Sequence, residues 1–206
     1  MLDRKLGVAL IGMGGAVATT AIAGIETIKA GLNGTDGLPL AGRHVHGLAP
    51  YASLVFGGWD LSGDDLATAV LRHGVLSERD LSSGASALRD MRPSRAVGST
   101  DFCANISGAH KIAAGSHRHA VDIIQTDLAG LRSTQGVDGV VMVNLASVER
   151  LPDLDAVCLQ DIDAFEQGLD RSDPAISPSM LYAYAAITAT RRTRTSRRAC
   201  RPTWRR

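Results

Sequence analysis

Apolar runs and amphipathic stretches follow one another along the chain and predict an alternation of buried strands and helices. Leu6 to Ile11 is a short apolar run that ends at a glycine cluster, and Tyr51 to Phe56 and Val140 to Leu145 are runs of the same kind. Apolar runs of this length with β-branched residues are typical of strands that are covered on both faces. We expect the second strand to end at Gly57-Gly58.

Helical spacing of apolar residues fills the intervals between these strands. The predicted helices cover residues 16–30, 64–73, 119–132, 160–169 and 179–189. In the first helix, Ile22, Ile25 and Ile28 are the candidate core contacts, and Gly31 ends the helix. We interpret residues 33–50 as a loop, and we can assign hardly any helix or strand within residues 77–108. Strands that alternate with helices predict an α/β fold, a doubly wound parallel sheet of the Rossmann type.

Composition supports this fold class, and the distribution of charge divides the chain. The 22 glycines and the aromatic content of 4% suit an α/β protein. Residues 191–206 hold eight arginines and no acid, so the other residues carry 14 basic and 21 acidic side chains and a net charge of −7. We therefore predict one domain over residues 1–190 and a disordered tail over residues 191–206.

Two origins of the arginine-rich tail stay open. The tail could bind nucleic acid or another acidic surface. Alternatively, it is the product of translating GC-rich DNA in a shifted reading frame, and we favour this second interpretation. The acidic charge of the remaining chain does not indicate a nucleic-acid partner.

Cysteine usage and hydropathy favour a cytoplasmic location. Cys103, Cys158 and Cys200 lie far apart without metal or redox spacing, which predicts reduced thiols. No apolar run reaches the roughly 18 residues that a membrane span needs. The apolar stretch after Lys5 is interrupted by glycines, and no convincing cleavage site follows it. We therefore expect no membrane partner. We also expect no metal ion, because His117 and His119, at the predicted start of a helix, would not face one another.

The glycine cluster is the strongest local motif. Gly12-Met13-Gly14-Gly15 follows a predicted strand and opens a predicted helix. Glycines at such a turn let the backbone approach a pyrophosphate, which the N–H groups of the helix N-terminus then bind. The alternative is a glycine-rich turn that binds nothing. Asp60, after the second strand, stands where dinucleotide-binding folds place a ribose-binding acid, although it could equally be a helix cap or a solvated loop acid.

Four segments in order carry a family resemblance: GMGGAVATTAIAGI (12–25), LVFGGWD (54–60), VMVNLASVER (141–150) and SPSMLYAYAAI (177–187). Together they resemble the myo-inositol-phosphate synthases. The resemblance implies an isomerase of inositol and phospholipid biosynthesis that converts D-glucose 6-phosphate to 1D-myo-inositol 3-phosphate. In this family NAD is a catalytic hydride carrier, so the reaction has no net redox change. The full-length family members are homo-oligomers.

Cofactor-binding residues follow from the resemblance, position by position. The glycine turn and the helix start would cradle the pyrophosphate, Asp60 would contact the adenosine side, and the end of the third predicted strand would pass beside the cofactor. These positions are Gly12, Gly14, Gly15, Ala16, Val17, Asp60, Leu145, Ala146, Ser147 and Val148. Val148 replaces the usual threonine, which removes one hydroxyl. Glu149 and Arg150 follow, with helix capping or surface pairing as the alternative to a role in the site.

The lysine-rich segment that completes the family's site is absent from this sequence. Only Lys5, Lys29 and Lys111 occur, and none lies in such a motif. The resemblance therefore implies the N-terminal NAD-binding part of a synthase, inactive by itself, and it assigns no catalytic residue. Two other functions stay open: an NAD-dependent dehydrogenase of the homoserine or aspartate-semialdehyde type, and a non-catalytic NAD-binding module.

Overall fold

A parallel β-sheet forms the centre of the protein. The computed structural model describes residues 5–43, 45–77 and 85–192. Within them, four strands lie in the order β3-β2-β1-β4. They are β1 (Leu6–Ile11), β2 (Leu54–Asp60), β3 (Ser94–Arg95) and β4 (Gly139–Asn144). All pairings are parallel, and Ile11 lies opposite both Trp59 and Asn144, so the carboxyl ends of the three long strands meet at one edge.

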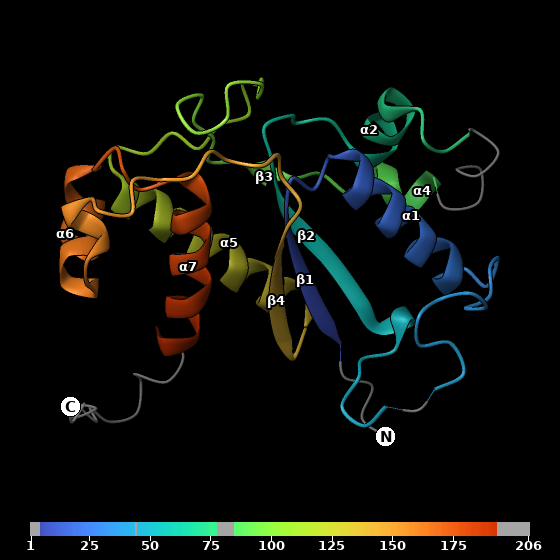
Figure 1. Ribbon diagram of the computed structural model, residues 1–206. Coiled ribbons are helices and arrows are strands. Elements are labelled where there is room, and N and C mark those ends of the chain that lie inside the picture. Colours follow the sequence, from blue (N-terminus) through green and yellow to red (C-terminus); the bar gives the residue numbers. More distant parts are fainter. Residues whose placement is uncertain (1–4, 44, 78–84, 193–206) are drawn as a thin grey trace.

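Helices cover both faces of this sheet (Figure 1). One side carries α1 (Ala16–Lys29), α2 (Leu66–His73) and α4 (Ala85–Asp90). The other side carries α5 (His117–Gln135), α6 (Ile162–Arg171) and α7 (Pro178–Arg192), and two short 3-10 helices, η1 (Tyr51–Ser53) and η2 (Val157–Leu159), complete the elements. The predicted α/β class with a doubly wound parallel sheet is confirmed.

The predicted elements other than the second strand are present, with their ends displaced by up to three residues. The first strand is as predicted, and each of the five predicted helices forms. Ser116 caps α5 by accepting a hydrogen bond from the His119 N–H, and Gly74 ends α2 in the left-handed conformation. The described residues between 33 and 50 form neither helix nor strand. Helix α4 and strand β3 lie in the stretch that the sequence left unassigned, because neither is long enough to show a hydrophobic period.

The prediction for the second strand was wrong at both ends. Residues 51–53 form the 3-10 helix η1, and the strand continues through Gly57 and Gly58 to Asp60. Gly58 has a φ of 152°, and a Cβ atom there would lie 2.0 Å from the carbonyl oxygen of Leu10 on the neighbouring strand. Gly58 therefore permits the close approach of β2 to β1, whereas the sequence-based prediction had the glycine pair end the strand.

Each face of the sheet packs against its own hydrophobic core. Ala9 and Ile11 of β1 belong to the core under α5, α6 and α7, whereas Leu10 belongs to the core under α1, α2 and α4. Of the three isoleucines predicted to anchor α1, only Ile22 is fully buried, and Ile25 and Ile28 are half-buried. Small residues take the remaining contacts, since Ala18, Thr19, Ala23 and Thr27 are buried beside Ile22.

Trp59 connects the sheet to the helices of one layer. Its side chain is 1% exposed, its ring lies 5.1 Å from the ring of Tyr182 in α7, and its Nε1–H donates to Asp127 Oδ2 in α5 at 2.7 Å. The Tyr182 hydroxyl in turn accepts a hydrogen bond from the Val97 N–H at 2.9 Å. Burial raises the pKa of the Asp127 carboxyl, and the hydrogen bond from Trp59 partly offsets this rise.

Some sequence-based predictions fall on residues that the structure does not describe. Arg191 and Arg192 belong to α7, but the rest of the predicted tail, residues 193–206, lies outside the described residues, as does Cys200. Cys158 is buried and Cys103 is half-buried, both with free thiols. Among the described helices, none has the length and apolarity needed to cross a membrane.

We predict that Gly58→Ala destabilises the protein by more than about 3 kcal/mol, because backbone strain of about 1–3 kcal/mol adds to an overlap with β1. The control is Gly24→Ala in α1, where the added methyl meets no atom within 4 Å. Because alanine favours helices, this variant should be more stable by up to about 1 kcal/mol. Urea unfolding measures both changes, and equal stability of Gly58→Ala and the wild type would contradict this account of β2.

Asp127 gives a prediction that depends on pH. Because its folded-state pKa is raised above 3.8, ionisation costs stability, and this cost appears as the pH rises through the folded pKa. Asp127→Asn keeps an oxygen that can accept from Trp59 and cannot ionise, so it should be at least as stable as the wild type at pH 7. Its advantage should vanish below pH 3.8.

The comparison variant for this test is Asp127→Leu, which leaves the buried Trp59 N–H without an acceptor. It should lose about 1–3 kcal/mol of unfolding free energy. Chemical unfolding at several pH values measures both variants. If Asp127→Asn is as unstable as Asp127→Leu at pH 7, the charge of Asp127 stabilises the fold and our interpretation is wrong.

Candidate functional site

The glycine turn between β1 and α1 is held by the backbone of β2. The N–H groups of Gly12 and Met13 both donate to the carbonyl oxygen of Trp59, at 2.9 and 3.0 Å. The Gly15 N–H donates to the Gly12 carbonyl at 3.0 Å, which closes the turn. Gly12 has a φ of 80°, a conformation that glycine adopts without strain.

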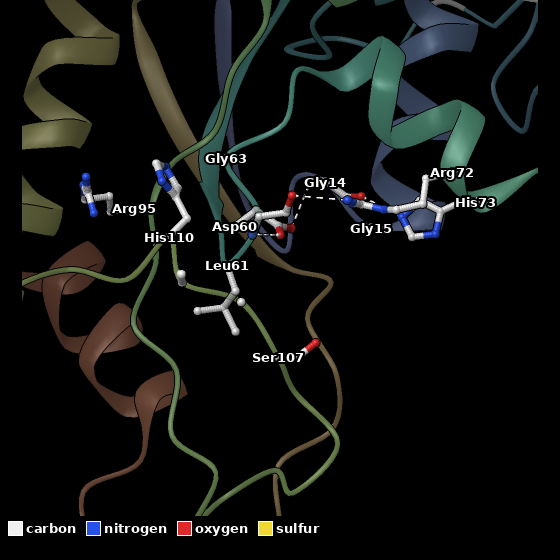
Figure 2. A pocket seen from close by; sticks show the side chains of 13 residues that line it. Gly14, Gly15, Asp60, Leu61, Gly63, Arg72, His73, Arg95, Ser107 and His110 are labelled. Atoms are coloured by element: carbon white, nitrogen blue, oxygen red, sulfur yellow. Dashed lines mark hydrogen bonds between the residues drawn. The ribbon is translucent and has the colours of Figure 1, made fainter.

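Gly14 is hydrogen-bonded through both of its backbone polar groups to side chains from other elements. Its N–H donates to Asp60 Oδ2 at 2.8 Å, and its carbonyl oxygen lies 2.8 Å from Nε2 of His73, at the end of α2. A Cβ atom on Gly14 would approach the Asp60 carboxyl group to 3.1 Å. The other carboxylate oxygen of Asp60 accepts from the Ser62 N–H at 2.9 Å (Figure 2). Asp60 therefore fixes the backbone of the glycine turn at Gly14.

The backbone donors available to a ligand belong to the first turn of α1. All four glycine-turn N–H groups, from Gly12 to Gly15, have partners within the protein. In the described part of the chain, no acceptor is bonded to the N–H groups of Ala16, Val17 and Ala18, and no side chain caps the helix at Gly15. Ala18 is fully buried, so the N–H groups of Ala16 and Val17, at the positive end of the helix dipole, are the two that an anion such as a pyrophosphate can reach.

Strand β4 brings its following residues against this turn. A Cβ atom on Gly12 would lie 3.0 Å from the backbone of Ala146, so only glycine permits this approach. The Leu145 N–H donates to the Ile11 carbonyl at 2.9 Å, and the Ala146 N–H donates to the Asn144 side chain at 3.0 Å. These contacts fix the segment after β4 against the glycine turn.

Two adjoining cavities lie along this edge of the sheet. The larger, cavity A, has a volume of about 760 Å³ and lies between the glycine turn, the ends of β2 and α2, and residues 107–110. Cavity B, of about 310 Å³, lies between the turn, residues 96–107 and residues 145–149. Both are lined by Gly15, Asp60, Leu61 and Ser107, so they meet beside the start of α1.

The two cavities differ in charge. Cavity A has two arginines in its wall, of which Arg72 forms an ion pair with Asp64 and Arg95 donates a long hydrogen bond of 3.4 Å to the Lys111 carbonyl. Figure 2 shows Asp60 between Arg95 and the turn, with Arg72 on the other side of Gly14. The charged residues in the lining of cavity B are the acids Asp60 and Glu149.

Glu149 caps the N-terminus of α7. Its carboxylate accepts from the Ser179 N–H at 3.0 Å and from the Ser179 hydroxyl at 2.7 Å, and Glu149 also lines cavity B. The contacts of Glu149 therefore agree with helix capping, which was the alternative to a role in the site. Arg150 donates from Nε to the Asp101 carbonyl at 2.6 Å, and its guanidinium lies over the Phe102 ring, 4.7 Å from the centroid.

The structure brings most of the predicted cofactor-binding residues to the edges of these cavities. Gly12, Gly14, Gly15, Asp60, Leu145, Ala146 and Ser147 line at least one of them. Val17 is 66% exposed and lines neither cavity, and Ala16 also lines neither, so the free backbone N–H groups are what these two residues offer to a ligand. Val148 is 91% exposed and lines neither cavity.

Sequence reasoning missed the residues that come from α2 and from the segment after β3. These are His73 and Arg72 in cavity A, and Gly98, Ser99 and Asn105 in cavity B. Gly98 and Ser99 were an available signal, because ligands lie at the carboxyl ends of parallel strands, where small residues leave room for them. His117 and His119 begin α5, and in the described part of the chain no group of three or more potential metal ligands occurs.

A doubly wound parallel sheet with a glycine turn, free helix N–H groups and two cavities at its carboxyl edge defines a dinucleotide-binding domain. The family model of the NAD-binding domain of myo-inositol-1-phosphate synthase matches residues 39–192. The chain belongs to this family, and NAD is the cofactor of the family's domain.

Similar proteins agree with this assignment. The chain is 30% identical to inositol-3-phosphate synthase 1 of Bacteroides thetaiotaomicron, over 89% of this chain and 46% of that protein. It is 29% identical to inositol-3-phosphate synthase 1 of Oryza sativa subsp. japonica, over 89% and 42% of the two chains. The crystal structure of inositol-3-phosphate synthase from Caenorhabditis elegans has the same fold, with a TM-score of 0.79, 18% identity and coverage of 90% and 43%. The chain thus spans less than half the length of these relatives.

Proposed function

We propose that this chain is the NAD-binding part of an inositol-3-phosphate synthase and that it binds NAD across cavities A and B. One observation carries this proposal: Gly15, which lines both cavities, immediately precedes the free N–H groups at the start of α1. A dinucleotide has its pyrophosphate between two nucleosides. Such a molecule fits an anion site with one cavity on either side.

The remaining residues then take distinct roles toward the cofactor. The adenosine half lies in cavity A, where the carboxylate of Asp60 has further lone pairs to accept hydrogen bonds from the ribose hydroxyls. The nicotinamide half lies in cavity B, beside Leu145, Ala146 and Ser147. Gly12 allows this segment to approach the turn, and therefore sets the width of the site at this point.

The full synthase reaction converts D-glucose 6-phosphate to 1D-myo-inositol 3-phosphate, and NAD supplies reversible hydride transfer in it. The substrate carries a phosphate, and the reaction develops negative charge on an enolate oxygen. Both need cationic groups in a dry site. Neither lysine nor arginine lines cavity B, where Glu149 and Asp60 are acidic. We infer that the described residues bind and orient the cofactor and that the cations must come from elsewhere.

Location and assembly complete the proposal. We expect the protein in the cytoplasm, in agreement with the free thiols of Cys103 and Cys158. Self-association is expected of the full-length synthases, and nucleic acid is not an expected partner of residues 1–190. We retain the boundary between this domain and the tail after residue 190 as a prediction.

Replacing Ala16 with proline tests the anion site. Proline is tolerated at the first position of a helix, and Gly15 before it is extended, with a φ of −75° and a ψ of 161°, as a residue before proline should be. Ala16→Pro removes one of the two N–H donors that an anion can reach and leaves the helix intact. A hydrogen bond to a charged group contributes about 1.5–3 kcal/mol, so NAD should bind roughly 10- to 100-fold more weakly.

The matched control is Ile162→Pro, at the first position of α6 on the other side of the sheet. Isothermal titration calorimetry with NAD should show wild-type affinity for this control. Thermal unfolding should show that both variants fold. NAD binding of Ala16→Pro with unchanged affinity would show that the start of α1 is not the pyrophosphate site, and no binding by the wild-type chain would refute the proposal.

The purified 206-residue chain, given D-glucose 6-phosphate and NAD, should form no inositol phosphate, because cavity B, on the nicotinamide side, has no lysine or arginine in its lining for the substrate phosphate. Chromatographic detection of inositol phosphate would contradict this expectation. Net formation of NADH with homoserine or aspartate semialdehyde would instead support the dehydrogenase alternative, since a synthase returns its hydride to the product.

A further inference from the structure

His73 is connected to the glycine turn by a contact that the proposed cofactor role does not yet explain. It is the last residue of α2, and its Nε2 lies 2.8 Å from the carbonyl oxygen of Gly14, 59 residues away in the sequence. A carbonyl oxygen only accepts hydrogen bonds, so Nε2 is the donor. In the described part of the chain, no other donor reaches this oxygen.

The peptide group that His73 holds is unusually free to rotate. It joins Gly14 to Gly15, and neither residue has a Cβ atom to restrict its φ and ψ angles. A half-turn of this peptide would break the bond from the Gly15 N–H to the Gly12 carbonyl and would turn the Gly14 carbonyl oxygen toward the Gly12 carbonyl oxygen. Two carbonyl oxygens that face each other repel, so the turn would open and the free N–H groups at the start of α1 would be displaced.

Two contacts oppose this rotation. The Gly15 N–H is fixed by the Gly12 carbonyl. The bond from His73 is the one that holds the carbonyl oxygen itself (Figure 2). His73 lies in the wall of cavity A and is exposed to solvent, so its replacement leaves the hydrophobic core unchanged.

We propose that His73 is a positioning residue, which keeps the Gly14–Gly15 peptide in the orientation that closes the turn, so that the N–H groups at the start of α1 are held in place for the cofactor pyrophosphate. This inference rests on the proposed NAD binding. It assigns to α2 a role in cofactor affinity that requires no contact between His73 and the phosphates.

The test compares three variants of the full 206-residue chain by calorimetry with NAD, with ADP and, in competition with NAD, with adenosine. His73→Leu removes the donor and should weaken NAD and ADP binding equally, by about fivefold, which corresponds to about 1 kcal/mol. Adenosine has no pyrophosphate, so its affinity should not change. His73→Gln supplies an amide N–H to the same oxygen and should restore most of the lost affinity.

His119→Leu is the matched control, since His119 is an exposed histidine on α5, on the opposite side of the sheet. It should bind all three ligands as the wild type does, and thermal unfolding should be the same for all three variants. Unchanged NAD affinity of His73→Leu, an equal loss for adenosine, or no rescue by His73→Gln would each overturn the role of His73. A wild-type chain that does not bind NAD would instead refute the proposed function, and the inference with it.

Discussion

The position of Trp59 is the constraint on which the rest of the structure depends. Its carbonyl oxygen accepts the N–H groups of Gly12 and Met13 and so fixes the turn that begins α1. Its side chain, on the other side of the backbone, joins α5 through Asp127 and α7 through Tyr182. One fully buried residue therefore couples the geometry of the proposed cofactor site to the packing of the opposite helical layer. Displacement of either helix would change the turn through Trp59.

The same interactions show why the fold was easier to predict than the site. The strand at residues 6–11 is covered on both faces, so its apolar run indicated it directly. The second strand was misplaced because glycine usually signals an end, and only the partner strand shows that Gly58 is needed for close approach to Leu10. Similarly, Ile25 and Ile28 looked like core residues of α1, although alanines and threonines fill the tight contact beside Ile22.

For the site, the local motif predicted the right region but not the chemistry of each group. The glycines were expected to bind the pyrophosphate, yet the N–H groups from Gly12 to Gly15 are used within the protein. The donors that stay free belong to residues that are not glycine, from Ala16 to Ala18. Asp60 was predicted as an adenosine contact, and its bonds to Gly14 and Ser62 could not be foreseen from sequence spacing. His73 lies 59 residues from its partner, and no local pattern identifies such a contact.

Glu149 has a consequence for how a ligand is aligned. Two helices, α1 and α7, begin beside cavity B, and each N-terminus is a centre of positive potential. The carboxylate of Glu149 neutralises the centre at α7. Of the two helix N-termini, only that of α1 therefore keeps its positive potential. A molecule with one charged bridge between two uncharged ends finds one stable position along such a groove, and the unequal sizes of the two cavities decide which end lies on which side.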